Sequence, residues 1–233
     1  MRALTAAGAA LACGAAVGAA TRLLDVPPPQ RAACASFALF GLACVAGAAW
    51  DAKDAPVVSR LRRGAFAALT ATAAAWLGAA AAGLPSAAGG AAVVGGAAVA
   101  AFGTAALLRT AGAPDAHASF AGAAAVAAMA GLLFVADPFV EWNAGGPGSR
   151  GRAETVVALS PLASIGADAG LDWQRSKWLY DGPATGAAGL SVIGQYYPSR
   201  TTPAWAWGLA AALTGLSLLA LAGPRGRGGR LPA

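Results

Sequence analysis

Residues 64–108 read GAFAALTATAAAWLGAAAAGLPSAAGGAAVVGGAAVAAFGTAALL, a stretch without Asp, Glu, Lys, Arg or His. Its one strong helix-breaking element is Gly83-Leu84-Pro85-Ser86, which is typical of a tight turn. A membrane core about 30 Å thick needs roughly 20 apolar residues for one helical crossing. The stretch therefore predicts two membrane-spanning helices, at about residues 64–84 and 87–108, joined by a short turn.

Charge-free runs of similar length occur elsewhere along the chain. They predict further spans at about residues 3–20, 32–50, 118–136 and 203–223. The chain is 58% hydrophobic and 11% charged, whereas a soluble domain carries about 25% charged residues. We expect an all-α integral membrane protein with about six transmembrane helices, organised as a five-helix region over residues 1–136 and a sixth helix at 203–223.

The Lys and Arg residues between the spans predict an orientation. With six spans, nine of them fall in short segments on the side of the two termini and two fall on the other side. Short cytoplasmic segments carry an excess of Lys and Arg, so we expect cytoplasmic N- and C-termini in a bacterial-type inner membrane, with a basic tail at 224–233. This placement accounts for the net charge of +6, and no nucleic-acid partner is expected. Because Arg2 precedes an apolar run, a cleaved signal peptide is an alternative for the first helix.

Residues 137–202 then form a long extracytoplasmic loop. Within it, Thr155–Ala167 is apolar but too short to cross a membrane and contains Pro161, so we expect a short re-entrant or interfacial helix there. Tryptophan favours the membrane–water boundary, which predicts interface anchors at Trp142, Trp205 and Trp207. The loop also interleaves aromatic and charged residues, and we expect a contact surface for lipid or a partner at Trp173, Arg175, Lys177, Trp178 and Tyr180.

The sequence lacks a recognisable catalytic or metal-binding motif. A Ser-His-Asp triad is excluded by the expected topology, because His117 is the only histidine and lies on the cytoplasmic side. The three cysteines, Cys13, Cys34 and Cys44, lie in the first two spans without metal-ligand spacing. We expect a non-enzymatic protein without cofactor or metal. Loop carboxylates such as Asp137, Glu141 and Asp172 leave open a membrane enzyme acting on a lipid-linked substrate.

Two features of the spans favour contacts with other helices or proteins. Gly14 and Gly18 form a G-x-x-x-G pair, and further glycines crowd the fourth span, which favours close helix packing within the chain or against a partner subunit. In an Ala- and Gly-rich chain the same pattern also arises by chance. The inner segment 51–63 carries Arg60, Arg62 and Arg63, which fix the topology or couple to a cytoplasmic partner.

This layout resembles that of ABC-2-type exporter permeases. Those proteins have six spans, cytoplasmic ends, a charged coupling loop between the second and third spans, and short re-entrant helices between the fifth and sixth. Asp51–Arg63 and Thr155–Ala167 occupy these places, and Ser160-Pro161-Leu162 and Tyr196-Tyr197-Pro198 are similar to the last third of such proteins. The chain departs from the family in having only Arg2 before its first span, where those permeases carry an amphipathic helix.

The resemblance implies a membrane subunit of a transport assembly that works with a separate cytoplasmic ATPase or other membrane subunits, and a possible oligomer. The alternative is a structural or accessory membrane protein that binds a partner or lipid through its outer loop.

Overall fold

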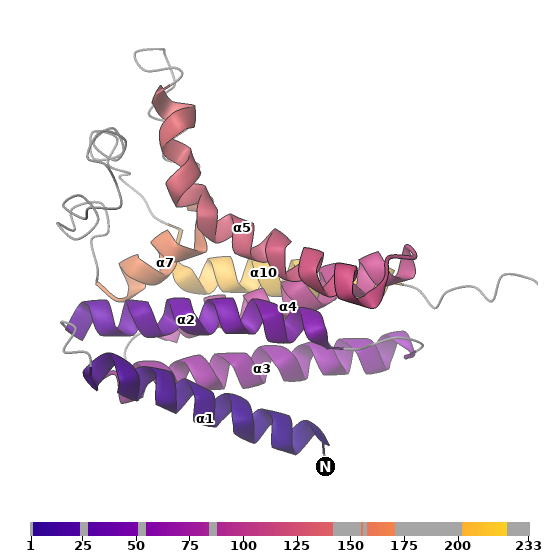
Figure 1. The fold of residues 1–233 in the computed structure, drawn as a ribbon, viewed down its shortest axis with the longest axis horizontal. Coiled ribbons are helices and arrows are strands. Elements are labelled where there is room, and N and C mark those ends of the chain that lie inside the picture. Colours follow the sequence, from indigo (N-terminus) through magenta and orange to yellow (C-terminus); the bar gives the residue numbers. More distant parts are fainter. Residues whose placement is uncertain are drawn as a thin grey trace, which may run out of the picture.

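The computed structural model describes residues 2–23, 28–50, 55–83, 88–141, 155, 158–170 and 202–222. Within these ranges the regular secondary structure is helical and no strand occurs, which confirms the predicted all-α class for this part of the chain. The helices are α1 (Arg2–Leu23), α2 (Pro28–Ala49), α3 (Val57–Ala81), α4 (Ala88–Thr110), α5 (Asp115–Glu141), α7 (Pro161–Asp168) and α10 (Ala204–Leu221) (Figure 1).

Prolines begin or precede several of these helices, and glycines follow the ends of some of them. Pro at the first helical turn costs no hydrogen bond, because the N–H that it lacks has no partner there. Pro28 and Pro161 are the first residues of α2 and α7, and Pro56 precedes α3. After α3 and α4, Gly83 and Gly112 adopt φ values of 93° and 99°, a left-handed conformation that only glycine adopts at little cost.

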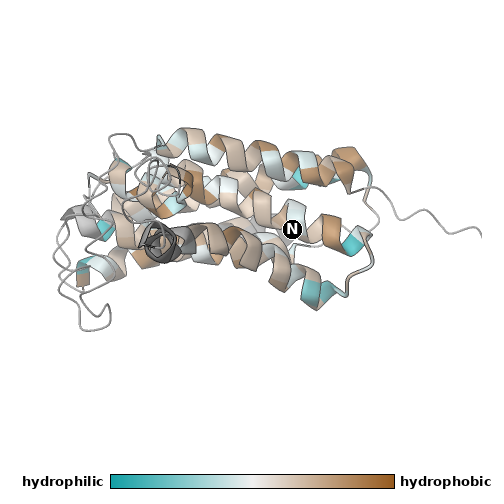
Figure 2. Ribbon diagram, turned by 90° about the horizontal axis from the view of Figure 1, so that it is seen from above, coloured by the Kyte–Doolittle hydropathy of each residue, from teal (hydrophilic) through white to brown (hydrophobic). Residues whose placement is uncertain are grey.

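Three of the described helices are long and apolar enough to cross a membrane: Val57–Ala81, Gly89–Thr110 and Ala204–Leu221. The first two helices contribute shorter apolar segments, Ala7–Leu23 and Ala33–Ala49. Figure 2 shows the hydrophilic residues mostly near the ends of the bundle, with apolar colours between them. Helices that are apolar around their whole circumference are typical of a membrane or a buried core.

The limits of two helices differ from the sequence-based expectation. Helix α3 begins at Val57 rather than near residue 64, so Arg60 and its neighbours lie in a helix and not in a loop. Arg is a good helix former and no breaker follows Pro56 there. Helix α5 continues through Pro138 to Glu141 instead of ending near residue 136, since a proline can bend a helix without ending it. Figure 1 shows α5 bending away from the bundle in its second half.

Helix α4 lies at the centre of the bundle and contacts α2, α3, α5 and α10. In its most apolar 18-residue window, 78% of the residues are buried, compared with 33% for α3 and 22% for α10. Its residues are mainly Ala, Gly and Val, and such small side chains let four neighbouring helices approach one axis closely.

The contact between α4 and α10 is made backbone to backbone. Gly96 and Gly103 of α4 face Gly208 and Gly215 of α10, and a Cβ added at either α4 glycine would collide with the carbonyl oxygen of its facing glycine. In both helices the two glycines are about two turns apart, so they lie on one face. The glycine pairs therefore fix the register of α10 along α4.

Glycines also join the remaining helices. The G-x-x-x-G pair of α1 packs inside the chain, with Gly14 against Ala74 and Gly18 against Gly78 of α3. Helix α2 meets α4 in the same way, because a Cβ on Gly47 would collide with the carbonyl oxygen of Ala98.

Two alanine substitutions in α2 test this packing. We expect Gly47→Ala to lower the stability by about 1–3 kcal/mol, since the added methyl group forces α2 away from α4. Gly41→Ala is the matched control, because nothing lies within 4 Å of a Cβ there, and the gain in helix propensity should leave it as stable as wild type or slightly more so. Thermal unfolding in detergent measures both, and equal melting temperatures would contradict the packing described.

Candidate functional site

The charged residues gather at the two ends of the bundle. One end is formed by the starts of α1, α3 and α5 and by the ends of α2, α4 and α10 (Figure 1). We call it the basic end, because Arg60, Arg62 and Arg63 lie near the start of α3 there and Arg109 lies in the last turn of α4. The opposite end carries Arg22 in the last turn of α1 and Asp168 at the end of α7, among other residues.

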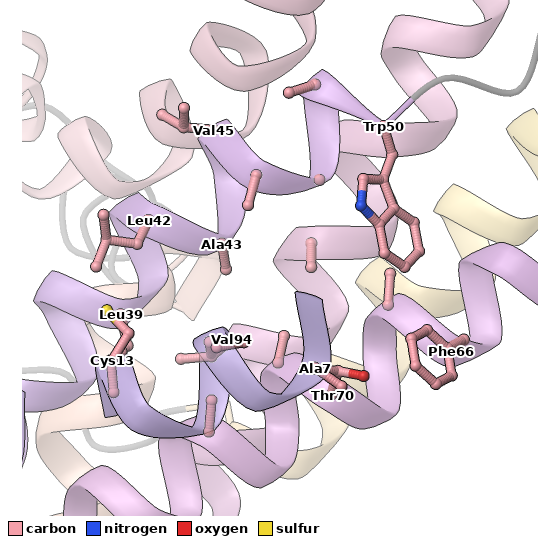
Figure 3. Close-up of a pocket in the computed structure, with 18 residues that line it drawn as sticks. Ala7, Cys13, Leu39, Leu42, Ala43, Val45, Trp50, Phe66, Thr70 and Val94 are labelled. Atoms are coloured by element: carbon pink, nitrogen blue, oxygen red, sulfur yellow. The ribbon is translucent and has the colours of Figure 1, made fainter. Parts of the chain in front are cut away.

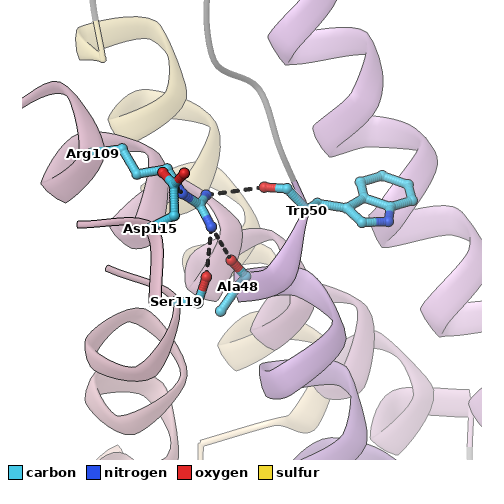
Figure 4. Close-up of polar contacts among 5 residues, drawn as sticks. All are labelled: Ala48, Trp50, Arg109, Asp115 and Ser119. Carbon is cyan, nitrogen blue, oxygen red and sulfur yellow. Dashed lines mark hydrogen bonds and ion pairs between the residues drawn. The ribbon is translucent and has the colours of Figure 1, made fainter. Parts of the chain in front are cut away.

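Arg109 joins three helices at the basic end, and only 7% of it is exposed. Its Nη1 donates to the carbonyl oxygen of Trp50 at 3.0 Å, and its Nη2 donates to the carbonyl oxygen of Ala48 at 2.8 Å and to the Ser119 hydroxyl at 2.6 Å (Figure 4). Its Nε lies 3.6 Å from a carboxylate oxygen of Asp115. Arginine satisfies the unpaired carbonyls at a helix end well, because its donors point in several fixed directions.

Through these contacts, Arg109 holds the C-terminal end of α2 against the turn between α4 and α5. Asp115 stands in the first turn of α5, where a negative charge is favoured by the helix dipole. Sequence reasoning treated Arg109 only as a topology charge. A single Arg in the last turn of an otherwise uncharged helix is the signal in the sequence from which this role could have been found.

The three arginines of α3 differ in exposure. Arg62 and Arg63 are exposed, but Arg60 is only 2% exposed. Its Nε and Nη2 atoms have no hydrogen-bond partner in the part of the chain that the structure describes. Of the three predicted coupling residues, only Arg62 and Arg63 are therefore placed at the surface. A buried donor without an acceptor lowers the stability of the folded state.

At the opposite end, a short helix, α7 (Pro161–Asp168), overlaps the stretch Thr155–Ala167 in which a re-entrant or interfacial helix was predicted, and its placement relative to a membrane stays a prediction. It packs against α2, α4, α5 and α10, and most of its residues are buried. An oxygen of the Asp168 carboxylate accepts a hydrogen bond from the backbone N–H of Gly90 at 3.0 Å. The first N–H groups of a helix have no partner inside the helix, so Asp168 caps the start of α4 from another element. This capping role of Asp168 was not expected from the sequence.

The two described tryptophans that were predicted as anchors have different environments. Trp205 is 62% exposed, as an interface anchor requires, and its anchoring role stays a prediction. The indole of Trp207 instead donates to the carbonyl oxygen of Leu159 at 3.0 Å and meets Phe40 edge-on, with ring centroids 6.3 Å apart. Trp207 thus joins α10 to α2 and to the segment that precedes α7.

An apolar pocket of about 390 Å³ opens between α1, α2, α3 and α4. In Figure 3, Trp50 and Phe66 lie on one side of it and Cys13, Leu39 and Leu42 on the other. Its lining is almost wholly hydrocarbon. Sequence reasoning did not find this pocket, because its walls are ordinary apolar helix faces.

Other expected site residues lie outside the part of the chain that the structure describes: Trp142, Trp173, Arg175, Lys177, Trp178 and Tyr180. Within the described residues, no group of three or more His, Cys, Asp or Glu side chains is placed to hold a metal ion. Comparison with protein-family models, curated proteins and solved structures found no match to this chain.

Replacing Arg109 with Met should lower the stability by roughly 1.5–3 kcal/mol, the range for hydrogen bonds to a charged group, because the carbonyl oxygens of Ala48 and Trp50 lose their donor. We expect Arg109→Lys to restore only part of the loss, since one ammonium cannot reproduce the guanidinium geometry. Thermal unfolding in detergent gives the comparison. Arg62→Met removes an exposed charge at the same end and serves as the control. A loss of the same size in both Met variants would exclude the bracing role of Arg109.

Proposed function

We propose that this chain is a six-span, non-enzymatic membrane subunit of a transport assembly, similar in layout to ABC-2-type exporter permeases. The observation that carries the proposal is the position of α7. It is a short helix, mostly buried, that lies between α5 and α10 in the chain, at the end of the bundle opposite the start of α1 and the end of α10 (Figure 1). In the layout of ABC-2-type exporter permeases, a short re-entrant helix is expected between the fifth and sixth spans.

The charge distribution supports an orientation with both termini in the cytoplasm of an inner membrane. Arg60, Arg62, Arg63 and Arg109 lie at the end where the chain starts and where α10 finishes. Lys and Arg are enriched on the cytoplasmic side of membrane helices, so the basic end faces the cytoplasm. Helix α7 and Asp168 then face the other side.

The interior of the bundle supports a subunit rather than a complete transporter. Intramembrane charged residues usually mark ion and substrate pathways, whereas α4 consists mainly of small apolar residues and packs against other apolar residues along most of its length. A polar substrate would therefore pass along a surface shared with another subunit or a second copy. Arg62 and Arg63, exposed at the start of α3, are the residues proposed for contact with a cytoplasmic ATPase.

Cysteine labelling in intact cells tests the proposed topology. In a background with Cys13, Cys34 and Cys44 replaced by Ala, Ala111→Cys in the exposed α4–α5 turn should react with a membrane-impermeant maleimide only after the cells are opened. Ala167→Cys, exposed on α7 at the opposite end, should react in intact cells. The reverse pattern, or equal labelling of both positions, would contradict the orientation.

Co-purification in mild detergent tests the transport assembly. We expect the double variant Arg62→Ala, Arg63→Ala to lose a cytoplasmic ATPase that accompanies the wild-type chain, because the exposed charges that dock it are removed. Arg22→Ala, which removes a positive charge at the opposite end, should retain it. If no ATPase accompanies the wild-type chain, or if the double variant retains it, the exporter-like role is excluded.

A further inference from the structure

We draw no further inference here: the strongest candidate, the apolar pocket of about 390 Å³ between α1, α2, α3 and α4, carries nothing because the structure does not show what fills it.

Discussion

The arrangement of this bundle depends on close contact between helix backbones at α4. In lipid, moving an apolar side chain from the hydrocarbon to a helix–helix contact gains little free energy. Association of the helices therefore depends on close packing. Helix α4 meets α10 through Gly96 and Gly103 and meets α2 at Ala98. In each case one methyl group more would separate the backbones, which leaves little freedom in the position of these helices along α4.

The two ends of the bundle are fixed by different chemistry from its middle. At the basic end, Arg109 supplies donors to the carbonyl groups that end α2 and to Ser119 of α5. At the opposite end, Asp168 accepts from the backbone at the start of α4. Both side chains satisfy helix-end groups that belong to other elements, so they hold separate parts of the chain together where the glycine contacts do not reach.

These contacts do not fill the space between α1, α2, α3 and α4. Helix α1 is held by α3 through Gly14 and Gly18, and its other half leaves the apolar pocket beside Trp50 and Phe66. Trp50 also packs against Phe102, with ring centroids 6.0 Å apart, so one wall of the pocket is anchored in the core.

The amino-acid sequence by itself determined that the chain is helical, apolar enough for a membrane and punctuated by Pro and Gly, because these properties are local. Hydrophobic length, helix propensity and turn residues act over a few neighbouring positions, and the short helix near Pro161 was predicted for the same reason. The tertiary structure alone decided that Gly14 and Gly18 pack on α3, that Arg60 is buried while Arg62 is not, and that Arg109 and Asp168 cap other helices. Each of these depends on which distant segment lies opposite a given residue, and a uniform Ala- and Gly-rich pattern does not specify that partner. The start of α3 at Val57 was also decided by the tertiary structure. The charged segment 51–63 indicated a loop, but from Val57 onward the backbone is helical.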